Sequence, residues 1–128
     1  MAARLRHALD SAGCRLLVDV LHPNVCWHPP YGTGTSCHSR SHVLSRCARL
    51  HALGLWVAVE ETFAYPTAVV LGLRIHGTVS PADPARVQYH VFHVHEGLIT
   101  RITGYADRAE ALDAAFSATT AGSGPARP

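Results

Sequence analysis

Histidine is the residue type in this sequence best suited to chemistry near neutral pH. The chain has ten histidines, and an imidazole with its ordinary pKa of about 6.5 can accept or donate a proton there. In the expected strand 86–95, alternation puts His90 and Phe92 on one side and His93 on the other. Phe92 marks the core side, where it would help to bind substrate. His90 is therefore our leading pocket acid/base, and a hydrogen-bonded structural histidine is the competing interpretation.

A Trp-His pair ends a short predicted strand, 24–28, and offers a second candidate site. His28 could act as a base, or it could be a rim residue held in place by the two prolines that follow it. In a regular strand Trp27 and His28 point to opposite sides, so only one of them can face a pocket unless the strand bulges. An inward Trp27 would form an apolar wall for a ring-shaped ligand.

Tyrosine hydroxyls are the candidate groups for stabilising negative charge. Tyr31 lies in a Pro/Gly-rich loop that would border the pocket mouth, and Tyr89 and Tyr105 lie on predicted strands. Their phenols could bind substrate and steady a developing oxyanion. For each tyrosine, packing in the core is the competing interpretation.

Carboxylates are fewer, with nine in the chain. Asp107 could act in catalysis, or it could form an Asp-x-x-Glu capping box with Glu110 at the start of a helix. Glu60 and Glu61 are consecutive, so a regular strand would turn one of them inward. That residue would be the best remaining carboxylate in the pocket.

No metal ion or other cofactor is expected. Alternation separates His90 from His93 and His95, and two ligands on one exposed strand make a poor site without a third. The four cysteines have neither metal-type spacing nor the density of a disulfide framework, so we expect reduced thiols; they are Cys14, Cys26, Cys37 and Cys47. No motif supports a Cys-His nucleophilic pair.

Composition sets the broad class. A chain of 128 residues with 48% hydrophobic and 16% charged residues predicts one globular domain. The net charge of +2, with no stripe of arginines, argues against nucleic acid as a partner. We find no secretory leader and no apolar run of roughly twenty residues, so we expect a cytoplasmic protein that does not bind membranes.

Hydrophobic periodicity predicts helices first and then strands. Helices are expected at 2–12, 14–21, 41–53 and 108–117, and strands at 24–28, 55–64, 67–76, 86–95 and 98–105. Gly54 is expected to cap the third helix, and Glu96-Gly97 to form a tight hairpin turn. Helices followed by mostly adjacent antiparallel strands predict an α+β fold.

Four segments, in this order and spacing, resemble the SnoaL-like family of the nuclear transport factor 2-like superfamily. The segments are Asn24–His28, His38–Leu44, Phe92–Ile99, and Tyr105–Asp107 followed by Ala111-Leu112. The resemblance implies a cone-shaped, cystatin-like α+β fold, in which a strongly curved, mostly antiparallel sheet wraps around N-terminal helices and encloses a pocket. It also implies a single domain over residues 1–118, followed by a disordered tail over 119–128.

The family contains polyketide cyclases, ketosteroid isomerases and epoxide hydrolases, together with some binding domains. The resemblance implies a cofactor-independent acid/base isomerase, cyclase or hydrolase that acts on a small hydrophobic molecule with a carbonyl or epoxide. The alternative is a non-catalytic ligand-binding or dimerisation domain, and a homodimer is expected in both cases. The isomerases carry aspartate-proline where this chain has His28-Pro29, and the cyclases carry tryptophan-aspartate where it has Thr103-Gly104. We therefore expect histidine to replace the family's carboxylate.

Overall fold

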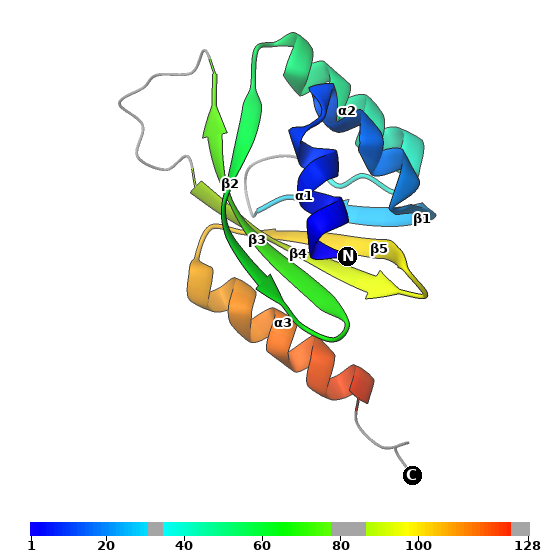
Figure 1. Cartoon of the computed structure of the whole chain (residues 1–128), viewed down its shortest axis with the longest axis vertical. Coiled ribbons are helices and arrows are strands. Elements are labelled where there is room, and N and C mark those ends of the chain that lie inside the picture. The colour runs from blue at the N-terminus through cyan, green and yellow to red at the C-terminus, as the bar shows by residue number, and fades with distance from the viewer. Residues whose placement is uncertain (31–34, 78–86, 124–128) are drawn as a thin grey trace.

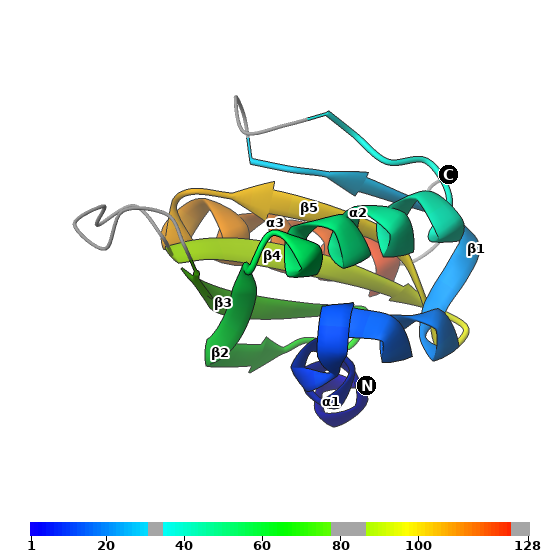
Figure 2. The same ribbon diagram turned by 90° about the horizontal axis from the view of Figure 1, so that it is seen from above.

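The computed structural model describes residues 1–30, 35–77 and 87–123. Its elements in chain order are α1 (Ala2–Asp10), the 3₁₀ helix η1 (Ala12–Asp19), β1 (Leu21–His28), α2 (Arg40–Ala52), β2 (Trp56–Ala64), β3 (Ala68–His76), β4 (Val87–His95), β5 (Leu98–Tyr105) and α3 (Arg108–Ser123). The strands form one curved, unclosed sheet in the order β1-β5-β4-β3-β2 (Figures 1 and 2). Strand β1 runs parallel to β5, and the other neighbours are antiparallel. The α+β class expected from the sequence is confirmed.

The helices lie on both faces of the sheet (Figure 1). Helix α3 contacts β3, β4 and β5, whereas α1 contacts β2 and α2 contacts β1. We call the face toward α1, η1 and α2 the inner face, and the face toward α3 the outer face. Each face has its own core. The inner core includes Leu5, Leu21 and Phe92, and the outer core centres on Val91 and Ala115.

Local sequence signals explain where α2 begins and ends. The Ser39 hydroxyl accepts a hydrogen bond from the His42 backbone N–H, which caps the first turn. At the other end Gly54 adopts φ +85°, and its N–H donates to the His51 carbonyl. A left-handed residue after the last turn is the usual helix stop, and glycine adopts it without steric cost. The predicted glycine cap is confirmed.

Of the boundaries that differ from the prediction, three bear on the fold. Strand β1 begins at Leu21 and so includes Pro23, in a segment we expected to end a helix. Proline is tolerated because β1 is an edge strand whose register shifts between Leu21 and Cys26, where the missing N–H interrupts no ladder. The preceding helix is 3₁₀ and ends earlier, at Asp19. Helix α3 continues to Ser123, past the expected end at residue 117.

The β4–β5 hairpin has the expected tight turn. Glu96 and Gly97 adopt φ +52° and +81°, the paired positive values of the turn whose twist matches that of the strands. Among the described residues, no helix combines the length and apolar character needed to span a membrane.

Candidate active site

A cavity of about 1180 Å³ lies between the inner face and the layer formed by α1, η1 and α2. Its floor on the sheet is largely apolar and includes Leu73, Phe92 and Ile102, and Leu17 of η1 and Val43 of α2 lie in the helical layer opposite. This volume is somewhat above the usual range of about 300–1,000 Å³ for small-molecule pockets, so a ligand with two or more rings fits. The expected inward position of Phe92 is confirmed.

His90 lies at the centre of the floor. It is paired in the sheet with Leu71 on one side and Gly104 on the other, so the backbone holds it firmly. Only 6% of the residue is exposed. Neither ring nitrogen has a hydrogen-bond partner among the described residues. Burial lowers the pKa of His90 from 6.5 to about 4, because a charged imidazolium would lose its hydration. The ring is therefore neutral at pH 7, and the pattern-based placement of His90 on the pocket face is confirmed.

Trp27 forms the wall beside His90. Its ring centroid is 6.2 Å from that of His90, and the buried indole N–H also lacks a partner. The backbone of Trp27 exchanges two hydrogen bonds of 2.9 Å with Cys37 and is registered with Ile102 of β5. Strand β1 is thus held on both sides at this point. The wall predicted for an inward Trp27 is present.

Arg46 on α2 also contacts the Trp27 ring. Its Cζ lies 5.1 Å from the ring centroid, and its Nη2 donates to Thr35 Oγ1 at 2.9 Å. The sequence analysis identified neither Arg46 nor Gln88 as a pocket residue. Gln88 lies two residues before His90 on β4 and lines the same cavity. The available signal for Gln88 was the same strand alternation that placed His90.

Charged side chains gather around the cavity. Arg6 and Asp10 come from α1, and Arg46, Arg49 and His51 come from α2. Three arginines therefore stand against a single carboxylate among the described lining residues. The sheet side of the cavity is largely apolar, and positive charge gathers on the side formed by α1 and α2.

Two thiols also line the cavity. Cys14 and Cys47 are joined by a side-chain hydrogen bond, which together with burial raises the pKa of the Cys47 thiol. All four cysteines are free, and Cys37 is the buried one. Cys26 Sγ lies 4.0 Å from His38 Nδ1, but neither of these two residues lines the cavity.

The structure corrects the prediction for His28. Because β1 turns Trp27 inward, His28 is directed elsewhere and does not line the cavity. Its Nδ1 lies 2.9 Å from Ser36 Oγ, and its ring meets the ring of His38 edge-on with centroids 6.4 Å apart. His28 is therefore a structural residue of the β1 margin, in agreement with the competing interpretation.

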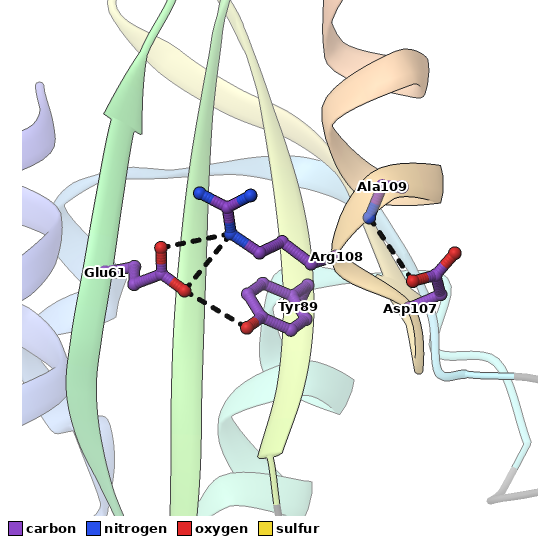
Figure 3. Close-up of polar contacts among 5 residues, drawn as sticks. All are labelled: Glu61, Tyr89, Asp107, Arg108 and Ala109. Atoms are coloured by element: carbon purple, nitrogen blue, oxygen red, sulfur yellow. Dashed lines mark hydrogen bonds and ion pairs between the residues drawn. The ribbon is translucent and has the colours of Figure 1, made fainter.

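Tyr89 and Tyr105 are also not at the cavity. Both pack into the outer core. The Tyr89 hydroxyl donates to Glu61 at 3.1 Å, and Arg108 reaches the same carboxylate at 3.1 Å (Figure 3). Burial and the adjacent Glu61 carboxylate raise the pKa of Tyr89, so this phenol stays protonated. The prediction that these two tyrosines bind substrate in the pocket is wrong, because neither of them lines the cavity. Tyr31 lies outside the described residues.

A bulge explains why neither adjacent glutamate enters the cavity. The register of β2 against β3 shifts between Val59 and Glu61, which makes Glu60 the extra residue. Glu61 then lies on the outer face, and the exposed Glu60 pairs with Arg74, with Nε and Oε2 2.6 Å apart. The prediction of an inward carboxylate assumed a regular strand, and the strand is not regular.

Asp107 is a helix cap. Its Oδ1 accepts from the Ala109 N–H at 3.4 Å at the start of α3 (Figure 3). The residue is exposed and does not line the cavity. We therefore correct its assignment as a catalytic candidate. In the described part of the chain, no group of three histidine, cysteine or acidic side chains could hold a metal ion.

Gly104, in the last strand, has its inner side occupied by a proline. A Cβ built on Gly104 would lie 2.8 Å from both the ring Cγ and the backbone N of Pro30. Gly104 is the cross-strand partner of His90, so the Pro30 ring covers the sheet next to the imidazole. No carboxylate side chain fits at this position. His90 is consequently the titratable group deepest in the cavity among the described residues.

Comparison with known proteins supports this architecture. No family model matches the sequence, and no curated protein matches it. The structure is similar to a protein with a cystatin-like fold from Xanthomonas campestris, with 15% identity, coverage of 84% of this chain and 89% of that chain, and a TM-score of 0.67.

Two further similar structures are described by a related fold and by an activity, respectively. One is a protein from Catenulispora acidiphila with a ketosteroid isomerase-like fold, in complex with trimethylamine (14% identity, 87% and 88% coverage, TM-score 0.65). The other is the epoxide hydrolase/cyclase-like enzyme SalBIII of pyran ring formation in salinomycin (16% identity, 84% and 88% coverage, TM-score 0.61). The fold implied by the resemblance in the sequence is thus confirmed: the chain has the fold shared by NTF2-like, ketosteroid isomerase-like and cyclase-like proteins.

Proposed function

We propose that the chain is a small-molecule enzyme that uses the neutral imidazole of His90 to move a proton on a hydrophobic carbonyl compound, without a cofactor. The observation that carries the proposal is a buried histidine, with both ring nitrogens unpaired, on the floor of a large apolar cavity. Leaving buried polar atoms unpaired costs about 1–3 kcal/mol each. Such a cost is common where a ligand supplies the missing partner.

The lowered pKa suits a base in this role. A buried imidazole that is neutral at pH 7 can accept a proton from the carbon next to a carbonyl group. Burial disfavours a lone imidazolium, but the same step creates an enolate beside it, and the two opposite charges stabilise each other in a low dielectric. Bases with a pKa between about 4 and 5 are effective in buried enolising sites.

Trp27 is positioned to assist. Its unpaired indole N–H lies near His90 and can donate to the substrate oxygen on which negative charge develops. Return of the proton from His90 to a different carbon gives an isomerised product. Attack of the enolate carbon on a second carbonyl of the same molecule forms a C–C bond as the C=O π bond breaks, and the new alkoxide takes the proton from His90 to give a cyclic alcohol. Both ring nitrogens of His90 are buried, so a substrate must shift the Trp27 or His90 ring as it binds.

A non-catalytic ligand-binding role is the second candidate. It is favoured by the lack of a carboxylate on the cavity floor, where Pro30 fills the space beside Gly104. In that case the apolar cavity would hold a ligand, and His90 would only donate or accept a hydrogen bond.

Exchange of α-protons for deuterium in 2-tetralone, followed by NMR in D₂O, tests the proposal. This reaction reports enolisation whatever the natural substrate is. We expect the wild type to accelerate exchange and His90→Gln to lose at least about 100-fold of that acceleration. The matched control is His93→Gln, since His93 is on the same strand but faces away from the cavity, and it should retain the wild-type rate.

The outcomes separate the two candidates. Saturable binding of 2-tetralone without accelerated exchange supports the non-catalytic role. Accelerated exchange that survives in His90→Gln would mean that another group is the base.

A further inference from the structure

The guanidinium of Arg46 lines the cavity and has no ion-pair partner among the described residues. Arg46 is half-buried. One N–H donates to the neutral hydroxyl of Thr35, and the guanidinium plane lies over Trp27. A guanidinium has five N–H donors in a rigid fork, so most of its hydrogen-bonding capacity is unused by these contacts.

The neighbours of Arg46 increase the positive charge around it. Arg49 and Arg6 also line the cavity, and the acid among the described lining residues is Asp10, at the exposed end of α1. Val43, Arg46, Cys47 and Leu50 recur at helical spacing, so they share the α2 face that lines the cavity. Arg46 is thus presented to the ligand by a rigid element, among the apolar and thiol side chains of Val43, Cys47 and Leu50 and beside Arg49.

The cavity has a layered order. Arg46 lies over one side of the Trp27 ring, and the Trp27 ring lies near His90 on the floor. All three side chains line the same cavity, and Arg46 is less buried than His90. A ligand that contacts His90 with one end and Trp27 with its apolar body can therefore contact Arg46 with its other end. Planar anions are the natural partners of this fork, because they accept two parallel N–H bonds from it.

We infer that the ligand of this cavity carries a carboxylate, which Arg46 binds, in addition to its apolar body. The inference rests on the proposed function, because it names the class of molecule that the same cavity takes: an aromatic or alicyclic carboxylic acid. Arg46 is a specificity-determining residue in this scheme. Arg49 and Arg6 add long-range attraction for an anion.

A matched pair of probes tests the inference directly. Binding of 2-naphthoate and of its neutral counterpart 2-naphthamide is measured by quenching of the fluorescence of Trp27 and Trp56, which both line the cavity. We expect the wild type to bind 2-naphthoate at least about tenfold more tightly than 2-naphthamide, since a charge-assisted pair is stronger than a neutral one.

The variant Arg46→Gln should lose the preference for naphthoate while its affinity for naphthamide changes less than about threefold, because only the charged contact is removed. The matched control is Arg15→Gln, an exposed arginine of η1 that does not line the cavity. It should keep the wild-type preference. An unchanged preference in Arg46→Gln would overturn the inference.

A measurement on the wild type alone guards against a variant that fails to fold. Raising NaCl from about 20 mM to about 500 mM should weaken naphthoate binding severalfold and leave naphthamide binding unchanged. Salt-independent naphthoate binding contradicts the inference. Equal binding of both probes overturns the inference but leaves the proposed function standing, whereas failure of both probes to bind overturns the two together.

Discussion

Two adjacent residues of β4 lie on opposite faces of the sheet and have opposite surroundings. On the outer face, the Tyr89 hydroxyl donates to Glu61, whose carboxylate also accepts from Arg108, so each polar group has a partner (Figure 3). On the inner face, both nitrogens of His90 lack one. Satisfied polar groups stabilise a fold and unsatisfied ones destabilise it. The outer face is therefore arranged for stability, and the inner face keeps groups available for a ligand.

Acid should expose this difference most strongly. The pKa of His90 is about 4 in the folded chain against an ordinary 6.5, so as pH falls below 6.5 the unfolded chain takes up a proton that the folded chain does not. The contribution of His90 to the free energy of unfolding is therefore complete above pH 6.5. It falls by on the order of 3 kcal/mol between pH 6.5 and pH 4. Burial lowers the pKa of His93 as well, which acts in the same direction.

Urea unfolding across this pH range measures the effect. His90→Leu should have a flatter dependence of unfolding free energy on pH than the wild type. Parallel curves for the two proteins would show that His90 is not the titrating group.

Each face also has a glycine that makes room for a ring, and the two should differ in tolerance. A methyl group on Gly104 meets the ring and backbone N of Pro30, whereas one on Gly72 meets the Tyr89 ring edge at 2.8 Å. A side-chain ring can move and a backbone atom moves less easily. We expect Gly104→Ala to cost about 2–3 kcal/mol and Gly72→Ala about 1 kcal/mol or less. Thermal unfolding of both variants checks the order, and the reverse order would contradict it.

Removing a polar group from each face should have effects of opposite sign. Tyr89→Phe deletes one side of a satisfied pair and should lower stability by about 1 kcal/mol. At pH 7.5, His90→Leu removes unpaired nitrogens from an apolar site and should raise stability by a similar amount, together with loss of the proposed activity. Chemical denaturation at fixed pH provides both values. A destabilised His90→Leu would mean that the imidazole has partners in solution.

The inner face was predictable where one strand is regular. Alternation along β4 correctly placed His90 and Phe92 on the inner face. The same rule puts Tyr89 on the outer face, so the sequence already contained the signal against assigning Tyr89 to the pocket. The bulge at Glu60 had no local signal, because it depends on how β2 pairs with β3. Placement of Glu61 therefore required the fold.

Arg46 shows a different kind of limit. Helical spacing puts Val43 and Cys47 on one face of α2, and both line the cavity. Arg46 shares that face, but from the sequence alone an arginine is expected to be exposed to solvent. What identifies Arg46 is its contact with Trp27, which comes from a distant strand. Catalysis, the homodimer and the cytoplasmic location stay predictions.

The parallel pairing of β1 with β5 has a consequence for how the molecule is assembled. Strand β1 belongs to the first quarter of the chain and β5 to the last, yet Trp27 of β1 is registered with Ile102 of β5. The antiparallel meander from β2 to β5 can form from neighbours in sequence, whereas β1 must wait until the final hairpin exists. The wall carrying Trp27 can therefore join the sheet only after β5 has been synthesised, whereas the pairing among β2, β3, β4 and β5 does not involve β1.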